Sequence, residues 1–389
     1  MKKLVVVLAG VLVLAVSAVG SGFAKPSRNI VGQVYVNDNT AGVNTVAGFN
    51  RHADGSLSPI PGSPFQVGGA GTGKGTASQG ALQLSADGRF LFAVDAASNQ
   101  ISVLRIERDG SLDSADGSPV ASGGVNPVSI AVSGKLVYVA NQGPGTNPGD
   151  ANYTGFKFSA GHLNPIDGST VALPSDAVPG QVLFNADGTK LVGTRIGSSE
   201  IDSFIVVRHG RLLSAIGSPF AAQAFSPPQG YGQLGSAFSP TNPDQLFVSD
   251  AHVAAGGPAP GLVSSFTDDD HGTLAPVGAS PVANDGTASC WVEISHDGKF
   301  LFVVNTASKT VSSYAVGADG SLTFLQSTSA TALGAGAEDV RLAPDGNTLW
   351  VVQAGADAVT GFSVSGGSLT PLSTTAGPTG AAPTGIVVT

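Results

Sequence analysis

Apolar and polar residues alternate along most of the chain in short runs, and the runs are separated by residues typical of turns. Representative pairs of runs are "FLFAVDA" followed by "NQISVLRI", and "FLFVVNT" followed by "KTVSSYAV". A period of two predicts strands with one buried face, and no long window has apolar residues at helical spacing. We therefore expect an all-β protein, apart from one apolar run at the N-terminus.

The turn that follows the second run of each pair recurs along the chain. It is centred on Asp54, Asp109, Ala160, His209, His271, Asp319 and Gly366, at intervals of 47 to 62 residues. Six units also begin with a further strand, as in "GQVLFNADG", and a fourth short strand often leads into "GSP". Seven units of four antiparallel strands predict a seven-bladed β-propeller. The aspartates of its Asp-Gly turns should cap the turn backbone, and the glycines should supply positive φ.

The two chain ends distinguish a closed ring from an open stack of units. The first unit lacks an innermost strand, whereas "PTGIVVT" at residues 383–389 is an additional strand of the right kind. We expect this strand to join blade 1 and close the ring, so that residues 31–389 form one domain. The turns after the first and third strands then share one face, called the turn face. The loops after the second strands and the crossovers between blades share the other, called the loop face.

Residues 1–24 have the pattern of a secretory signal peptide. Lys2 and Lys3 precede an apolar run from Leu4 to Val19, and small residues follow up to Ala24. We predict cleavage after Ala24, a short linker at residues 25–30, and a secreted or periplasmic protein without a membrane span. An uncleaved membrane anchor is the alternative, although the run is short for one.

The mature chain would be acidic and sparsely charged. Without Lys2 and Lys3 the chain has 16 of its 18 basic residues and 27 acidic residues. Only 12% of all residues are charged. Since no basic run is present in the sequence, we expect neither nucleic acid nor an anionic membrane as a partner. The single cysteine, Cys290, excludes an internal disulfide, so burial must stabilise the fold. We expect a monomer.

Several motifs that could carry chemistry are better explained as turns or loops. "GGAGTGKG" at residues 68–75 lacks the Ser or Thr that a phosphate-binding loop needs after lysine, so we expect a flexible crossover. "TDDDHG" at residues 267–272 should be a solvated acidic turn. No two histidines have metal-ligand spacing, so neither a metal nor a cofactor is expected. Only His252, two residues after Asp250, lies in a connection on the loop face, where we expect ligand binding.

The innermost strands carry the stronger candidates. Alignment of the blades on their first turns places Glu293 and Arg341 at one level in adjacent blades, where the two can form an ion pair. The same alignment places four further polar or aromatic residues along the channel: Asp339, Glu338 and Trp291 near its mouth, and Gln181 on its wall. Polar groups so near the axis are costly unless they are paired or wet. They can form a paired, hydrated channel lining or a binding or catalytic centre.

An innermost strand ending in "SADG", "NADG", "SHDG" or "APDG", then "FLFVVN" and "DGSL", resembles the seven-bladed lactonase-type propellers. That family includes propeller 6-phosphogluconolactonases and carboxymuconate-cyclising enzymes, and the resemblance spans residues 31–389. It implies catalytic His and Arg side chains at the starts of innermost strands. The matching stretches, residues 179–188 and 232–240, contain neither. No catalytic residue is therefore carried over, and fold alone does not fix function.

Two functions from different classes remain, and the sequence leaves open whether the protein is an enzyme. The first is a secreted propeller that binds a small molecule or a protein at its channel and loop face without turnover. The second is a divergent lactone hydrolase, in which Arg341 would stabilise an oxyanion and Glu293 or Asp339 would serve as base. The candidate ligand-binding residues are Gln181, Trp291, Glu338 and His252.

Overall fold

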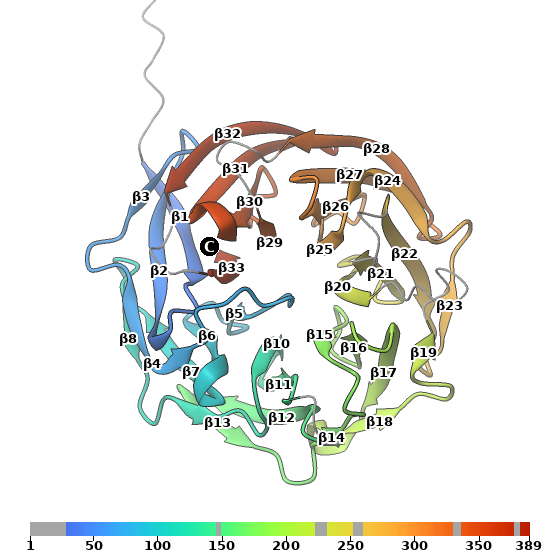
Figure 1. Ribbon diagram of the computed structural model, residues 1–389, viewed down its shortest axis with the longest axis horizontal. Helices are drawn as coiled ribbons and strands as arrows, with labels where there is room; N and C mark the ends of the chain where they lie inside the picture. Colours follow the sequence, from blue (N-terminus) through green and yellow to red (C-terminus); the bar gives the residue numbers. More distant parts are fainter. Residues whose placement is uncertain (1–28, 145–148, 222–231, 252–259, 330–335, 377–381) are drawn as a thin grey trace, which may run out of the picture.

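The computed structural model describes residues 29–144, 149–221, 232–251, 260–329, 336–376 and 382–389. They form a ring of seven antiparallel β-sheets around a central axis (Figure 1). Each sheet is one blade, and its strands follow one another from the axis to the rim. The all-β, seven-bladed propeller predicted from the sequence pattern is therefore confirmed.

The first four blades occupy residues 30–221 and the C-terminal strand. Blade 1 contains β33 (Thr384–Val388), β1 (Ile30–Asn37), β2 (Gly42–His52), β3 (Leu57–Pro59) and β4 (Phe65–Gly71). Blade 2 contains β5 (Leu82–Leu84), β6 (Phe90–Asp95), the 3₁₀ turn η1 (Ala96–Ser98), β7 (Gln100–Ile106), β8 (Leu112–Ser114) and β9 (Val120–Ala121). Blade 3 contains β10 (Pro127–Ser133), β11 (Leu136–Asn141), β12 (Asn152–Ser159), β13 (His162–Pro165) and β14 (Val171–Ala172). Blade 4 contains β15 (Pro179–Phe184), β16 (Lys190–Arg195), β17 (Glu200–Val206), η2 (Arg208–Gly210), β18 (Leu212–Ser214) and β19 (Phe220–Ala221).

The remaining three blades complete the ring. Blade 5 contains β20 (Gly232–Phe238), β21 (Gln245–Ala251), β22 (Pro260–Asp268), β23 (Leu274–Pro276) and β24 (Val282–Thr287). Blade 6 contains β25 (Ser289–Ile294), β26 (Phe300–Asn305), β27 (Thr310–Val316) and β28 (Leu322–Ser329). Blade 7 contains β29 (Ala337–Leu342), β30 (Thr348–Gln353), η3 (Ala354–Ala356), β31 (Ala358–Ser365) and β32 (Ser368–Ala376).

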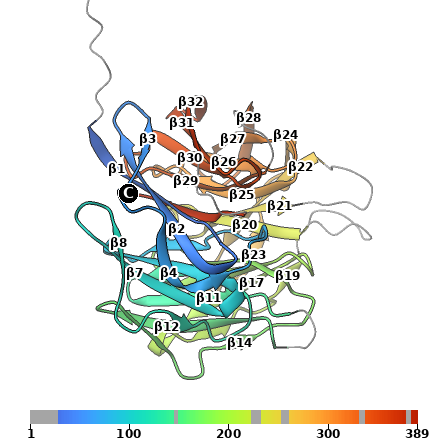
Figure 2. The same cartoon turned by 60° about the vertical axis from the view of Figure 1, so that its left-hand side comes forward.

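The C-terminal strand closes the ring, as the orphan sequence at residues 383–389 predicts. Strand β33 pairs antiparallel with β1, with Ile386 opposite Val36. The pairing continues past the strand end, because the Thr389 N–H donates to the Gln33 carbonyl over 2.9 Å. The C-terminus therefore lies beside β1 inside the ring (Figures 1 and 2).

Blades 1 to 5 depart from the simple four-strand pattern at their outer edge. The outermost strand is split into two short strands that pair with opposite ends of the third strand, as β3 and β4 do with β2. The interruption leaves an N–H of the third strand without a backbone partner. The serine hydroxyl of the "GSP" motif accepts a hydrogen bond from this N–H. Ser63 Oγ lies 2.8 Å from the Gly48 nitrogen, and Ser118 Oγ lies 2.8 Å from the Val103 nitrogen. The recurring motif thus satisfies a backbone donor that would otherwise lack a partner.

Apolar side chains hold neighbouring blades together. The buried apolar residues of the described chain fall into seven clusters, one at each interface between consecutive blades. The cluster between blades 7 and 1 contains Trp350, Ile386 and Val388, so the C-terminal strand also contributes to the core. Strand alternation explains this arrangement, because alternate residues of a blade face its two neighbours.

The Asp-Gly turns are structural, as the sequence predicts. Asp297 accepts a hydrogen bond from the Lys299 N–H over 3.1 Å, and Asp319 accepts one from the Ser321 N–H over 3.0 Å. The following glycines, Gly298 and Gly320, have φ values of 71° and 86°. These conformations are accessible to glycine without the strain that a Cβ would bring.

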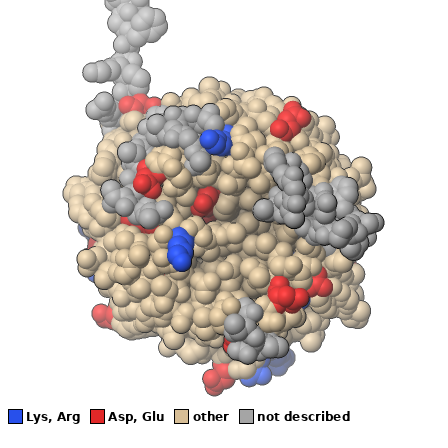
Figure 3. All heavy atoms as spheres, viewed as in Figure 1, with Lys and Arg blue, Asp and Glu red and all other residues tan. Residues whose placement is uncertain are grey.

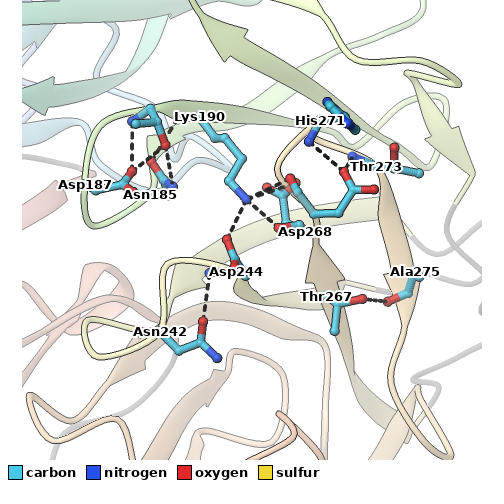
Figure 4. Close-up of polar contacts among 12 residues, drawn as sticks. Asn185, Asp187, Lys190, Asn242, Asp244, Thr267, Asp268, His271, Thr273 and Ala275 are labelled. Atoms are coloured by element: carbon cyan, nitrogen blue, oxygen red, sulfur yellow. Dashed lines mark hydrogen bonds and ion pairs between the residues drawn. The ribbon is translucent and has the colours of Figure 1, made fainter.

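The acidic run at residues 267–272 is only partly the solvated turn that we expected. Asp269 is exposed and accepts the His271 N–H, as a turn residue should. Asp268, by contrast, is the last residue of β22 and is fully buried. It faces Lys190 of blade 4, whose Nζ lies 3.6 Å from Asp268 Oδ1 and 2.8 Å from Asp244 Oδ1 (Figure 4). The expectation failed for Asp268 because a lysine distant in sequence meets it across the interface between blades.

The predicted signal peptide and most of the predicted linker lie outside the described residues, and β1 begins at Ile30. No helix in the described part of the chain is long and apolar enough to cross a bilayer. Cys290 is a buried free thiol whose pKa burial raises to about 11, and it packs in the cluster between blades 6 and 7.

Candidate functional site

A short segment of the crossover between blades 1 and 2 crosses the ring axis. We call residues 78–80 the plug segment. Ser78 and Gln79 are buried, just after the glycine-rich stretch for which we expected a flexible crossover. The first part of that crossover, up to Gly71, belongs to β4. The expectation of a flexible crossover, made for residues 68–75, was therefore wrong for residues 68–71.

The side chain of Gln79 bridges the axis to blade 6. Its Nε2 donates to the Val292 carbonyl over 2.7 Å, and its Oε1 accepts the Val292 N–H over 3.0 Å. The Gln79 backbone N–H donates to the Gly180 carbonyl of blade 4 over 3.1 Å. Gly235 leaves room for this amide, because a Cβ at Gly235 would lie 2.3 Å from Gln79 Oε1. The Gln79 side-chain amide thus pairs with the Val292 backbone as a neighbouring strand would, and it lies inside the ring.

Two residues predicted to lie at the channel mouth instead hold the plug segment. Trp291 donates from Nε1 to the Ser78 carbonyl over 2.7 Å. Asp339 accepts the Gly80 N–H at Oδ2 over 3.3 Å and its neighbour's N–H at Oδ1 over 2.8 Å. Both side chains are buried, and burial raises the pKa of Asp339. Trp291 and Asp339 therefore hold the plug segment in place by hydrogen bonds.

A cavity lies beside the plug segment and is lined mainly by residues of the innermost strands, towards the turn face. Its volume is about 210 Å³, and Gln79 forms part of its wall. Ala186 and Pro240, from the first turns of blades 4 and 5, also line it. We call this cavity the channel pocket. The sequence instead favoured the loop face for binding, so the cavity adds a second candidate location on the opposite face.

Glu293 and Arg341 form the ion pair expected from their matching levels. Arg341 Nη1 lies 3.3 Å from Glu293 Oε2, and both residues line the channel pocket. The Arg341 side chain is 24% exposed and that of Glu293 is 12% exposed. Burial raises the pKa of Glu293 to about 7, against the opposing influence of Arg341 and the Leu342 N–H. The pair is therefore neither sealed in the core nor freely solvated.

Two glutamines present amide groups to the same cavity. Gln181 Oε1 accepts the Ser236 hydroxyl over 3.0 Å, whereas its Nε2 donates to none of the described residues. The amide of Gln83 has no hydrogen-bond partner in the described part of the chain. Phe184 and Phe238 provide apolar wall beside these amides. The channel pocket thus combines apolar surface with a few convergent polar groups, as small-molecule sites commonly do.

Glu338 does not line the channel pocket. Burial and the neighbouring Asp339 raise its pKa to about 8, and its buried Oε2 has no hydrogen-bond partner among the described residues. Cys290 is close enough to Glu338 for its thiol pKa to be affected. The candidates that the sequence placed together are therefore divided, with Glu293, Arg341 and Gln181 in the pocket.

The remaining candidate cannot be placed, because His252 lies outside the described residues. Its neighbour Asp250 is buried in blade 5, where it accepts hydrogen bonds from Gln233 and Ser264 over 2.8 Å each. Of the described residues, no group of three His, Cys, Asp or Glu side chains could hold a metal ion.

The sequence did not reveal Gln79 as a pocket residue, and Ser236 was also missed. Gln79 stands in a glycine-rich crossover, and nothing in a local pattern indicates that such a segment turns towards the axis. Ser236 could have been found from the alignment of innermost strands, because it directly precedes Ala237 in β20. Its hydroxyl matters only through Gln181, which belongs to the preceding blade.

Solved structures with the same fold come from several bacteria. A protein of Lactobacillus plantarum is 20% identical, with a TM-score of 0.69, and the match covers 92% of this chain and 99% of that one. A putative 6-phosphogluconolactonase of Bacteroides fragilis is 19% identical, with a TM-score of 0.68 and coverage of 92% and 98%. A periplasmic gluconolactonase of Pseudomonas aeruginosa is 19% identical, with a TM-score of 0.67 and the same coverage. At this level of identity the likeness shows the fold.

Sequence comparison identifies the family. None of the curated proteins matches the chain. The family described as "Lactonase, 7-bladed beta-propeller", however, matches residues 43–146, from blade 1 through blade 2 into blade 3, and residues 237–388, from blade 5 to the C-terminal strand. The match agrees with the observed ring of seven blades. The chain therefore belongs to the lactonase family of seven-bladed β-propellers.

Proposed function

We propose that this protein binds a small oxygen-rich ligand of the lactone or sugar-acid class in the channel pocket. The observation that supports this most directly is the set of polar groups left available there. The Gln83 amide and the Gln181 Nε2 have no partner in the described chain, and Arg341 is partly exposed beside them. Hydroxyl and carbonyl oxygens of a ligand would accept hydrogen bonds from these donors.

The size of the cavity limits the ligand. Drug-sized pockets measure roughly 300–1,000 Å³, whereas the channel pocket measures about 210 Å³. A single sugar-like ring is a better match than a disaccharide or a peptide. The phenyl rings of Phe184 and Phe238 would contact the carbon face of such a ring, while the amides bind its oxygens.

Strands β15 and β20 match the positions of the family's catalytic stretches, and their side chains favour ligand binding over fast turnover. Strand β15 contributes Gln181 and β20 contributes Ser236 to the pocket. The family resemblance implies His and Arg side chains at the starts of these strands. An amide and a hydroxyl in this region can hold a ligand, but neither is a strong general base near pH 7.

A second candidate function is lactone hydrolysis, and the pKa of Glu293 favours it. A carboxyl group with a pKa of about 7 can accept a proton from a water molecule near neutral pH. That water would attack the lactone carbonyl carbon, and Arg341 would stabilise the oxyanion that forms. The ring C–O bond would then break, and protonated Glu293 would return its proton to the leaving oxygen. The net reaction adds one water to one lactone and gives one hydroxy acid.

We also propose export, because residues 1–24 have the features of a signal peptide. A structural relative is described as periplasmic. Cleavage after Ala24 would leave Lys25 as the first residue, which the intact mass of the exported protein would show.

Calorimetric titration with gluconate, and with freshly dissolved glucono-1,5-lactone, tests the binding function. We expect binding of at least one of them to weaken about tenfold in Gln83→Leu, because one ligand hydrogen bond to a neutral amide is lost. Gln326→Leu, on the outer strand of blade 6, is the matched control and should leave binding unchanged. A broader panel of lactones and hydroxy acids follows, and absence of binding across it would refute the proposal.

The same panel separates binding from catalysis. Hydrolysis above the buffer rate that disappears in Glu293→Gln, while binding persists, would establish the second function. Binding without turnover in the wild type would leave the first function alone. Turnover that survives both Glu293→Gln and Arg341→Met would contradict the catalytic assignment of this pair.

A further inference from the structure

A second cavity lies on the turn face, between the rims of blades 3 and 4. Its volume is about 340 Å³, and its apolar wall consists of Leu136, Ile166 and Val206. Lys135 and Lys157 line the same cavity, and no carboxylate does. We propose that this groove binds a small organic anion with an apolar body, such as a medium-chain carboxylate. The proposal does not depend on the function assigned to the channel pocket.

Lys135 lacks the counter-charge that its counterparts have. In blades 2 and 6 a basic residue follows the Asp-Gly of the first turn and pairs with that aspartate. Arg89 Nη2 lies 2.7 Å from Asp87, and Lys299 Nζ lies 3.4 Å from Asp297. Blade 3 has "SGKL" in place of "ADGRF" or "HDGKF", so the aspartate is missing while the lysine remains. Lys135 forms no ion pair with another described residue.

Lys157 also lacks the counter-charge that its counterpart in blade 2 has. Arg105 holds the corresponding place in blade 2, since it lies opposite Phe90 as Lys157 lies opposite Leu136. Arg105 pairs with Glu107, two residues further along the chain. Ser159 occupies that place in blade 3, and Lys157 likewise has no ion pair among the residues described. Two neighbouring cations are thus left without compensation.

The groove is preformed by contacts between the two blades. Tyr138 of blade 3 donates from its hydroxyl to the Gly210 carbonyl of blade 4 over 2.8 Å. This bond fixes the turn that carries His209 and Gly210 against blade 3, and both residues line the groove. The Phe158 N–H donates to the Lys135 carbonyl over 2.8 Å, which holds the turn that carries Lys135 against β12, the strand that carries Lys157. A ligand would therefore enter a site whose backbone is already ordered.

Charge and shape together select the ligand class. The protein has a net charge of −9, and only 12% of its residues are charged. Figure 3 shows the loop face, opposite to the face that carries the groove, and its charged side chains are likewise few and scattered over a largely uncharged surface. Two adjacent uncompensated lysines will therefore attract an anion locally. The apolar wall favours an anion with a hydrocarbon part over bare phosphate, and the volume suits a small molecule better than a protein segment.

Calorimetric titration of the full-length mature protein with octanoate at low ionic strength tests the proposal. We expect Lys135→Gln combined with Lys157→Gln to weaken octanoate binding at least tenfold. The double variant Lys299→Gln with Lys309→Gln removes the same charge elsewhere and should bind octanoate like the wild type. Because both groove lysines are exposed, their replacement should leave the fold intact, which circular dichroism checks.

Further arms separate the contributions of charge and apolar surface. Inorganic phosphate and octanol should each bind at least tenfold more weakly than octanoate. The near-isosteric Val206→Thr should weaken octanoate binding several-fold. Equal affinity for phosphate or octanol would overturn the proposal, as would octanoate binding that depends on Arg341 rather than on the two lysines. Absence of octanoate binding would overturn it as well.

Discussion

Two of the ion pairs between adjacent blades differ in what surrounds them. Lys190 and Asp268 join blades 4 and 5 and are both buried (Figure 4). The lysine Nζ also donates to the carbonyls of Asp268 and Asp269, and to Asp244 over 2.8 Å. Its protein partners therefore account for the hydrogen-bonding capacity of the ammonium group.

The other pair, Arg341 and Glu293, joins blades 7 and 6 at the channel pocket. The guanidinium is only partly engaged, through one contact to Glu293 over 3.3 Å and one to the Ile386 carbonyl over 3.5 Å. Guanidinium has five N–H donors, so capacity is left for a ligand. Charge alone therefore does not distinguish the two pairs, and the second differs because its cation keeps unused N–H donors beside a cavity.

The largest expected effect comes from removal of the cation in each pair. Lys190→Met should lower the free energy of unfolding by about 3–5 kcal/mol at pH 8, because Asp268 would remain buried without its counter-charge. Arg341→Met should cost about 1 kcal/mol or less, since the pair is partly exposed and Glu293 can reach solvent. Urea denaturation of the two variants measures both values.

A pH series sharpens this result. Burial raises the pKa of Asp268 to about 7, so much of the carboxyl should be protonated at pH 5 and need no cation. The cost of Lys190→Met should then be smaller at pH 5 than at pH 8. Equal costs for the lysine and arginine variants at pH 8 would remove the distinction between the two pairs.

The same contrast explains which features the sequence could predict. A repeat of about fifty residues predicted the ring, its closure by residues 383–389, and the position of Glu293 and Arg341 at the same level of adjacent blades. The prediction was possible because each blade repeats the same geometry. The Lys190–Asp268 pair did not follow, since Asp268 lies in a run that looks solvated and its partner stands 78 residues earlier. The plug segment was missed for a similar reason. Its position is determined by hydrogen bonds to several blades, whereas its sequence is that of a flexible loop.

A second prediction concerns the pH dependence of stability. Burial raises the pKa of Glu293 from 4.5 to about 7, so folding favours its protonated form. Its contribution to stability is therefore fully present below about pH 4.5 and is lost as the pH rises through 7. Glu293→Gln should reduce the loss of unfolding free energy between pH 4 and pH 8 by on the order of 3 kcal/mol, at 1.36 kcal/mol per pKa unit.

Asp297→Asn provides the control for this pH series. The pKa of Asp297 is lowered, chiefly by its hydrogen bond from Ser295, so its contribution has the opposite sign and appears as the pH rises. Urea denaturation at several pH values gives the slopes. A Glu293→Gln slope identical to that of the wild type would mean that the carboxyl has the same pKa in the folded and unfolded chains, and the case for a base near pH 7 would fail.

The smallest expected effect concerns Asp244, the exposed member of the Lys190 cluster. Its side chain is 50% exposed, although its Oδ1 lies only 2.8 Å from the lysine Nζ. Solvent screens such a contact, so Asp244→Asn should lower the free energy of unfolding by about 0.2–1 kcal/mol, far less than Lys190→Met. The loss should shrink further in 1 M NaCl, where the Debye length falls to about 3 Å. A cost of several kcal/mol that salt does not change would instead make Asp244, rather than the buried Asp268, the main counter-charge of Lys190.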